Sequence, residues 1–430
     1  AQSSGGTPRG WGWGGGGGGG GGLVWAIISI VDNLMQIEAG KAGINTEETN
    51  MSLFPKFGDL FSSEAPSFAK GHDFIKLKKG FDIKLAGAAP AAIEDAKSVT
   101  RHSVIPYNFR GLAPIPKVVV QAGDEVLAGD VLFFDKSNPD VKFVASVSGE
   151  IVEVLRGAKR SISNVTILAD KDQKSKLFKV PSLDKVSRED LVSFMAASGA
   201  WTYLNQRPFD VIPSLTDIPR DIFVSTFDTA PLAPDNSLII KGREADFQKG
   251  IEVLSKLTSG QVHLGVDGKS DAAGEAFLQF DNAEKHIFSG AHPAGNVGVQ
   301  IHHIKPIGLN DFVWTITMQE VIALGSLFLN GKFDGSRVVA VTGAELQEPK
   351  YVRTYVGANI AELVQGNLTG DHVRYVAGDV LSGEAKAADD FLNFKDDQLT
   401  VILEGDKYEA FGWLLPLAPR PSISKTFPSF

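Results

Sequence analysis

The sequence predicts a multidomain α/β protein, made of one small all-β unit and two units that combine strands with helices. Three observations support this: short β runs punctuated by glycine between residues 118 and 154, alternating strand and helix signals between 187 and 329, and three strands around a short helix between 337 and 376. The length of 430 residues, with 43% hydrophobic and 22% charged residues, is enough for two or three ordinary cores. The predicted divisions are a disordered glycine-rich leader at 1–70, the all-β unit at 71–170, the α/β unit at 171–333 and the last unit at 334–430.

The all-β unit consists of short runs in which apolar and polar residues alternate, as in half-buried strands. Tight turns separate these runs at Gly123-Asp124, Gly129-Asp130 and Ser148-Gly149. This spacing is similar to that of the barrel-sandwich hybrid fold of biotinyl and lipoyl carrier domains.

A carrier domain attaches its swinging arm to a lysine at the tip of a hairpin. In this sequence the tip position falls near Asn138, and Lys136 and Lys142 flank the turn. We therefore expect the carrier fold without the carrier chemistry, and solvated turn lysines in place of a modified one.

Strand and helix signals alternate in the following unit. The capping box Ser187-Arg-Glu-Asp190 opens a helix that ends before Gly199. Further strands are expected at 221–227 and 261–266, and further helices at 244–257 and 319–329. This alternation predicts a parallel, Rossmann-like sheet with helices on its faces.

The last unit begins near Arg337. Strands are expected at 337–342, 352–356 and 373–376, with a short helix at 359–364. One helix crossing a small sheet is a β-grasp arrangement.

Composition excludes several classes of site and partner. The net charge of −9 and the scattered basic residues argue against nucleic acid, whose phosphates require concentrated Lys and Arg. The absence of cysteine excludes disulfides, the usual structural zinc sites and cysteine-ligated iron–sulfur clusters.

The first seventy residues differ in composition from the rest. Gly14 to Gly22 is an unbroken glycine run that cannot bury enough surface to offset its chain entropy. The apolar run from Leu23 to Val31 is far shorter than the roughly 20 residues of a spanning helix. We expect an appended or mis-started leader, because Met35 and Met51 both offer plausible starts; a membrane-surface anchor is the alternative.

Six segments in register carry a family resemblance. They are Phe74–Gly87, Arg156–Arg160, Ser198–Phe209, Ala291–Gly295, Val313–Val321 and Phe411–Trp413. In this order and spacing the chain resembles the A subunit (NqrA) of the sodium-translocating NADH:quinone reductase, from about Phe74 to its last residue. The resembled subunits continue beyond the position of Phe430, so the chain is expected to be incomplete at its C-terminus.

The resemblance implies a role and a location. It implies a peripheral subunit of a respiratory complex that couples NADH oxidation and quinone reduction to sodium export, so that the chain is an enzyme only as part of that complex. It also implies no cofactor in this chain, with FAD, FMN, riboflavin and iron centres in partner subunits. The implied neighbour is the membrane-embedded B subunit (NqrB), at the cytoplasmic face of the bacterial inner membrane. The last unit looks like the soluble-ligand-binding β-grasp (SLBB) module of this family.

Wider relatives, the NADH-binding subunit of complex I and the C subunit of the Rnf complex, bind flavin and NADH through a glycine-rich loop after the first helix of the α/β unit. Glycines there let the backbone approach phosphates closely. At the corresponding place Trp201, Tyr203 and Leu204 carry bulky side chains. We therefore expect no dinucleotide at this loop, no catalytic residue and no cofactor-binding residue in the chain.

A quinone pocket is the one ligand site that the sequence suggests. Trp201, Tyr203 and Phe209, with Trp314, would give the apolar lining that such pockets have. His292 and Gly295 belong to a loop shaped by Pro293 and are expected beside a cleft. A filled core and a structural loop are the alternative interpretations.

Two further motifs are rejected. Gly268-Lys269-Ser270 follows a strand but lacks the glycine of a phosphate loop, whose place is taken by His263. His302 and His303 are adjacent and, as strand neighbours, are expected to point to opposite faces, so no metal site is predicted.

Two other functions stay open at this point. The first is an Rnf-type electron-transfer subunit, which the missing cysteines disfavour. The second is a soluble ligand-binding protein that uses the β-grasp module and carries the leader as an export or surface tether.

Overall fold

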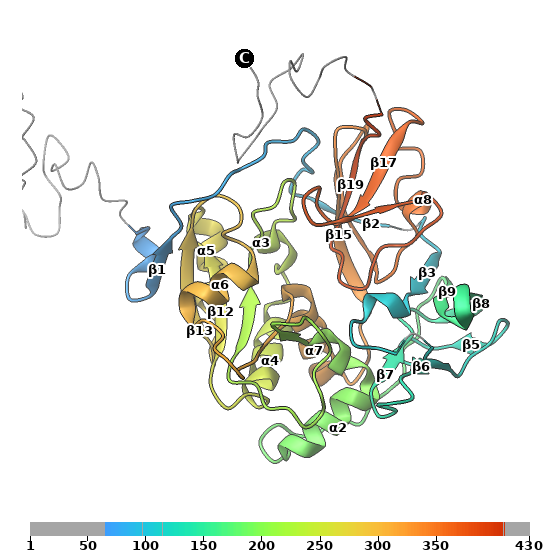
Figure 1. Ribbon diagram of the computed structural model, residues 1–430, viewed down its shortest axis with the longest axis horizontal. Coiled ribbons are helices and arrows are strands. Elements are labelled where there is room, and N and C mark those ends of the chain that lie inside the picture. Colours follow the sequence, from blue (N-terminus) through green and yellow to red (C-terminus); the bar gives the residue numbers. More distant parts are fainter. Residues whose placement is uncertain (1–64, 97, 114, 407, 409–430) are drawn as a thin grey trace, which may run out of the picture. The chain divides into compact units, whose positions relative to one another are not determined.

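The computed structural model describes residues 65–96, 98–113, 115–406 and 408 (Figure 1). The expected leader up to residue 64, the Phe411–Trp413 segment and the C-terminal end lie outside these residues. None of the described helices is long and apolar enough to cross a lipid bilayer.

The first unit contains two small antiparallel sheets, which confirms the barrel-sandwich prediction. One sheet has the order β3 (Arg101–Val104), β9 (Ile162–Ala169), β8 (Gly149–Arg156) and β5 (Glu125–Val126). The other has the order β4 (Lys117–Val118), β6 (Val131–Phe134) and β7 (Lys142–Val144).

Turn glycines and stacked aromatic rings explain the shape of this unit. Gly123 and Gly129 have φ values of 92° and 96°, which favour glycine. Phe133 of β6 and Phe143 of β7 are cross-strand partners, and their rings stack with centroids 4.9 Å apart. Lys142 flanks the hairpin turn as the first residue of β7; its ammonium lies 4.8 Å from the Phe134 ring and donates to a backbone carbonyl of the turn.

The second unit is a six-stranded sheet in which five neighbouring strands are parallel, as the alternation of strands and helices predicted. Its order is β1 (Asp73–Lys76), β13 (Glu284–Ser289), β12 (Val262–Asp267), β11 (Ile222–Ser225), β14 (Val313–Thr315) and antiparallel β10 (Asn205–Arg207). Its helices are α2 (Arg188–Ser198), α3 (Asn236–Ile239), α4 (Glu244–Ser255), α5 (Asp271–Leu278), α6 (Val297–Ile304) and α7 (Met318–Asn330).

Side chains alternate across β11 and show which helices cover each face. Ile222 and Val224 belong to the core that includes α4 and α7, whereas Phe223 packs with Ile301 of α6. Helix α6 therefore covers the opposite face from α4 and α7.

The third unit is a mixed six-stranded sheet with one short helix, in agreement with the β-grasp prediction. Its order is β18 (Glu384–Lys386), β17 (Val373–Ala377), β19 (Gln398–Leu403), β15 (Ser336–Thr342), β16 (Lys350–Tyr355) and β2 (Ile93–Asp95). Helix α8 (Ile360–Leu363) is capped by the Asn359 side chain, which accepts from the amide of Glu362.

The segment that precedes β3 contributes β1 to the sheet of the second unit and β2 to the sheet of the third unit. Strand β1 pairs in parallel with β13, and β2 pairs in parallel with β16. The range 71–170 therefore supplies strands to all three units. Parallel pairing between segments so far apart in the chain leaves no local signal in the sequence.

Helices α4 and α7 pack closely where Gly250 of α4 and Gly325 of α7 meet, and a substitution can test this contact. A Cβ atom at Gly325 would lie 1.7 Å from the carbonyl oxygen of Asp246, so Gly325→Ala must push the helices apart. We expect a loss of about 2–3 kcal/mol in the free energy of unfolding, measured by denaturant titration. Gly298→Ala on α6 is the control, because a Cβ atom there meets nothing within 4 Å and alanine is the better helix former. Equal effects of the two substitutions would contradict this packing.

Candidate functional site

The loop after α2 is filled by its own side chains. The turn Ala200–Tyr203 follows the C-cap glycine of α2, and all four of its residues are buried. Trp201 is fully buried, donates its indole Nε1 hydrogen to the Pro213 carbonyl at 2.9 Å and meets Trp314 edge-on at 5.3 Å between ring centroids. Bulky, buried side chains thus fill this loop.

The five residues expected at a quinone pocket differ widely in their surroundings. Trp201 and Tyr203 belong to the core, with the Tyr203 ring stacked on Phe394. Phe209 is 78% exposed. His292 and Gly295 lie on the loop before α6. The Thr229 hydroxyl is hydrogen-bonded to the His292 ring at 3.1 Å and accepts a hydrogen bond from the Gly295 amide at 3.0 Å. A quinone contact by this set stays a prediction.

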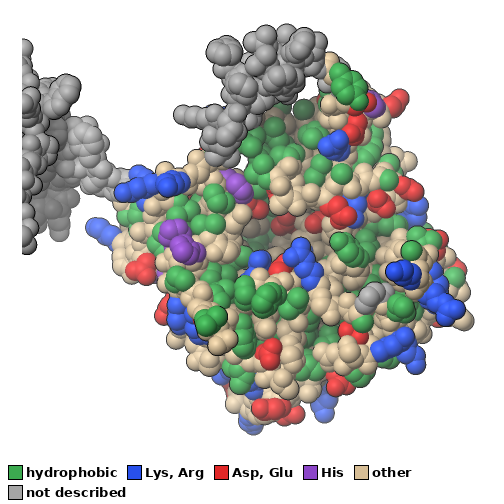
Figure 2. Space-filling model, in the orientation of Figure 1, with side chains coloured by type: hydrophobic (Ala, Val, Ile, Leu, Met, Phe, Trp, Pro, Cys, Tyr) green, Lys and Arg blue, Asp and Glu red, His purple; other side chains and the backbone are tan. Residues whose placement is uncertain are grey.

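A cleft of about 1250 Å³ opens among the described residues. Segments of all three units line it: 106–113 from the first, Asp228 and residues between 202 and 212 from the second, and 377–379, 382–384 and 393–398 from the third. Figure 2 shows a hollow in this face of the molecule with acidic side chains around it. The charged lining residues are Asp210, Asp228, Asp379, Glu384, Asp396 and Asp397 against Arg110 and Lys395.

Three carboxyl groups in this cleft have raised pKa values, which favour their neutral form. The pKa of Asp397 is raised to about 7, chiefly by burial, with Arg337 opposing the rise and the nearby Asp228 and Asp396 adding to it. Burial also raises the pKa of Asp228 and of Asp396. An acid that changes protonation near neutral pH therefore lies in the cleft.

Asp397 yields a prediction for the pH dependence of stability. Its carboxyl ionises near 3.8 in the unfolded chain and near 7 in the folded chain, so the folded state binds more protons between these values. The contribution of Asp397 to the free energy of unfolding therefore falls as pH rises from about 4 to about 7. Asp397→Asn is expected to raise it by about 1–2 kcal/mol at pH 8 and to leave it unchanged near pH 4, measured by denaturant titration at both values. A variant that matches the parent at pH 8 would contradict the raised pKa.

A buried ionic network connects the cleft to the core. Glu320 is fully buried and caps α7 by accepting from the Thr317 amide at 3.2 Å and hydroxyl at 2.9 Å. Lys395 lies 3.5 Å and Arg337 3.9 Å from its carboxylate oxygens. Lys395 also donates to the Tyr203 carbonyl at 2.8 Å.

No pattern in the sequence indicated this arrangement. Lys395, Asp396 and Asp397 form a charged run of the kind that usually marks a solvated turn. Only tertiary packing places Lys395 beside Glu320, which belongs to α7 of the second unit.

The histidines require a correction. His302 and His303 lie on helix α6, not on a strand, and their rings meet edge-on at 5.2 Å between centroids. The histidines that gather with a carboxylate are His263 on β12 and His286 on β13. Burial lowers the pKa of both, so both rings favour the neutral form.

Three family models match the chain. They are described as the NqrA N-terminal barrel-sandwich hybrid domain, over residues 75–170, the NqrA second alpha/beta domain, over 186–333, and the NQRA C-terminal domain, an SLBB domain, over 338–387.

Curated relatives agree with these matches. The chain is 39% identical over 355 residues to the A subunit of the Na(+)-translocating NADH-quinone reductase of Neisseria gonorrhoeae, covering 82% of this chain and 78% of that protein. It is 38% identical over 356 residues to the A subunit of the same reductase in Haemophilus influenzae, with the same coverage.

A solved structure of a NAD+-reducing [NiFe]-hydrogenase in the H2-reduced state matches 51% of this chain and 49% of that chain, with 12% identity and a TM-score of 0.33. This likeness is too weak to bear on function. The family models and the curated relatives confirm the resemblance seen in the sequence, and the chain belongs to the NqrA family, the A subunits of the Na+-translocating NADH-quinone reductase.

Proposed function

We propose that this chain serves as the peripheral, cofactor-free A subunit of a sodium-pumping NADH:quinone reductase and acts through the complex that it joins. The filled loop after α2 carries this proposal, because Trp201 and its neighbours leave no room for a dinucleotide. Electron transfer from NADH to quinone then takes place in partner subunits, which hold the flavins and iron centres. An Rnf-type electron-transfer subunit is the weaker alternative, because the 38–39% identity is to NqrA proteins.

The proposed neighbour is the membrane-embedded B subunit, at the cytoplasmic face of the membrane. Two exposed aromatic side chains at the edge of the cleft support a docking surface there, with Tyr107 83% and Phe209 78% exposed. Their segments are joined by an ion pair of 3.0 Å between Arg110 and Asp210. Exposed aromatic side chains are favoured anchors of protein interfaces.

Substitution of Phe209 tests this surface. We expect Phe209→Asp to reduce at least about tenfold the amount of the other subunits that co-purifies with the tagged chain. The substitution places a charge where an aromatic anchor would be buried in the interface. The melting temperature of the variant should stay unchanged, because the side chain is exposed in the single chain. Leu309→Asp, at a 95% exposed leucine between α6 and β14, is the matched control. Equal recovery with both variants would exclude Phe209 from the interface.

We propose the acidic cleft as the place of any quinone contact, in preference to the aromatic set around Trp201. The cleft is open and about 1250 Å³ in volume, and Asp397 is protonated over much of the range below pH 7. A protonated carboxyl can donate a hydrogen bond to a quinone carbonyl. Titration with a soluble quinone should raise the melting temperature of the chain and should do so less in Asp397→Asn. No shift in either protein would discard the quinone role.

The assembly itself is tested by affinity purification of the full-length chain from native membranes. Recovery with the other pump subunits and their flavins supports the proposal. Recovery of the chain alone, under conditions that keep the reductase active, would contradict it.

A further inference from the structure

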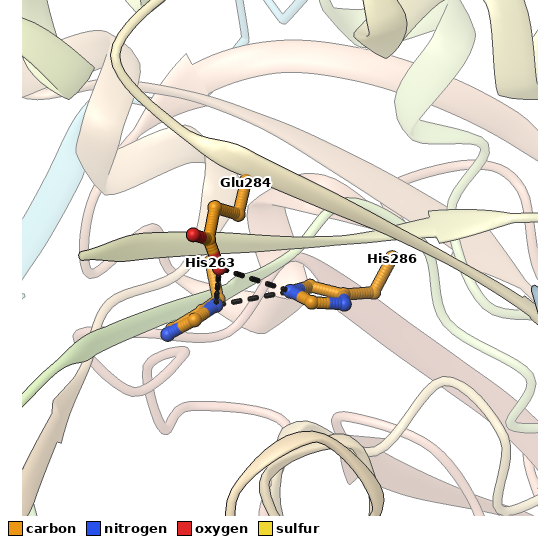
Figure 3. A group of neighbouring side chains, drawn as sticks. All are labelled: His263, Glu284 and His286. Carbon is orange, nitrogen blue, oxygen red and sulfur yellow. Dashed lines mark hydrogen bonds and ion pairs between the residues drawn. The ribbon is translucent and has the colours of Figure 1, made fainter. Parts of the chain in front are cut away.

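Two histidines and a glutamate converge on the face of the parallel sheet that α6 covers (Figure 3). Strand register pairs His263 with Glu284, and His286 follows two residues later on the same face. The Nδ1 atom of His263 lies 3.0 Å from Nε2 of His286 and 3.3 Å from Oε2 of Glu284. The third side of this triangle, from His286 Nε2 to Glu284 Oε2, is 3.9 Å. Three Lewis-basic atoms therefore share one small space.

These distances match those between the ligands of a tetrahedral ion. Zinc binds histidine nitrogen and carboxylate oxygen at about 2.0–2.2 Å, which places neighbouring ligand atoms about 3.3–3.5 Å apart. The observed spacings of 3.0, 3.3 and 3.9 Å scatter around that value. The ligands need to move by only a few tenths of an ångström to accept an ion.

Each outer ring nitrogen faces a carboxylate. His263 Nε2 lies 3.5 Å from Oδ1 of Asp221, and His286 Nδ1 lies 3.5 Å from Oδ2 of Asp73. Carboxylates in these positions favour the proton on the outer nitrogen of each neutral ring. The two inner nitrogens lie within hydrogen-bonding distance of each other, at 3.0 Å, and Glu284 Oε2 adds a third acceptor, so one proton cannot satisfy all three atoms. A cation between them satisfies all three.

We propose that His263, Glu284 and His286 bind a divalent transition-metal ion, with zinc as the best match to this ligand set. The rings are buried, whereas the Glu284 side chain is 54% exposed, so a water molecule on the solvent side can complete four-coordination. Asp221 and Asp73 stand where carboxylates orient zinc-binding histidines in proteins, behind the ring nitrogen that does not face the ion.

The position indicates a structural role for the ion. Asp221 lies just before β11, Asp73 and Glu284 begin their strands, and His263 is the second residue of β12. The site thus lies at the amino ends of the parallel strands, opposite the carboxyl ends near which ligands bind in such sheets. An ion there ties β12 to β13 and, through Asp73, holds the edge strand β1. This inference is independent of the proposed function.

Cobalt titration of the full-length chain tests the site. After removal of metals with a chelator, Co²⁺ should bind at one equivalent, give the visible absorption of a tetrahedral ion and be displaced by Zn²⁺. Zn²⁺ should also raise the melting temperature, since it binds the folded state. No visible cobalt band at stoichiometric concentration would overturn the proposal, and would leave a hydrogen-bonded histidine pair in its place.

Substitutions assign the binding to these residues. Glu284→Gln keeps the size of an exposed side chain and removes its charge, so it should fold and bind Co²⁺ at least about tenfold more weakly. His286→Gln should abolish the tetrahedral band. The double variant His302→Gln, His303→Gln is the matched control on α6 and should bind as the parent does. If Glu284→Gln, folded by circular dichroism, binds like the parent, or if the control loses binding, the assignment is wrong.

Discussion

Trp201→Ala is expected to lower the free energy of unfolding by about 3–5 kcal/mol, the range for removal of a large buried aromatic side chain. The indole is fully buried, packs edge-on against Trp314 and donates to the Pro213 carbonyl. Alanine removes the ring contact and leaves that carbonyl without its donor. Denaturant titration with an unchanged m-value measures the loss.

Phe209→Ala is the matched control, further along the same segment. Its ring is 78% exposed, so its removal should change the free energy of unfolding by less than about 0.5 kcal/mol. Comparable losses for the two variants would show that the loop after α2 is not filled as described. Trp201→Ala should also fail to acquire flavin, because Tyr203 and Leu204 remain buried beside it.

Glu320→Ala is expected to cost about 3–5 kcal/mol, because it leaves two cations without their buried counter-charge. Arg337 is 5% exposed, and its Nε and Nη1 atoms have no hydrogen-bond partner within the described structure. The substitution also removes the Glu320 half of the capping box of α7, in which its carboxylate accepts from the Thr317 amide. The loss is measured by denaturant titration at neutral pH.

Two controls separate the parts of this effect. Glu320→Gln keeps an oxygen for the cap and removes only the charge, so its loss should be smaller than that of alanine. Glu252→Ala breaks a surface pair with Lys249, whose ammonium lies 2.7 Å from the carboxylate, and should cost no more than about 1 kcal/mol. A loss below about 1 kcal/mol for Glu320→Ala would mean that the network is not coupled as the distances indicate.

Local signals predicted much of the fold. The capping box at Ser187 and the αL glycine at Gly199 bound α2 as expected. The alternation of strands and helices predicted the parallel core of the second sheet, and turn glycines predicted the small sheets of the first unit. Each of these signals lies within a few residues of the element that it specifies.

The sites depend on contacts that span the chain, and no local pattern could indicate them. The cleft joins segments near residues 110, 228 and 396, which no spacing rule relates. The cluster of His263 and His286 depends on the register between β12 and β13. Its one local trace is Glu284-Lys-His286, whose alternate residues point to the same face if the segment is a strand.

The proposed cofactor-free role depends on the loop after α2, which is filled by the buried Trp201, Thr202 and Tyr203. The most direct measurement is the visible absorption spectrum of the purified single chain, together with a titration by NADH. We expect no flavin absorption and no saturable NADH binding, while the assembled reductase shows both. Flavin or nicotinamide held by the single chain at one equivalent would contradict the claim.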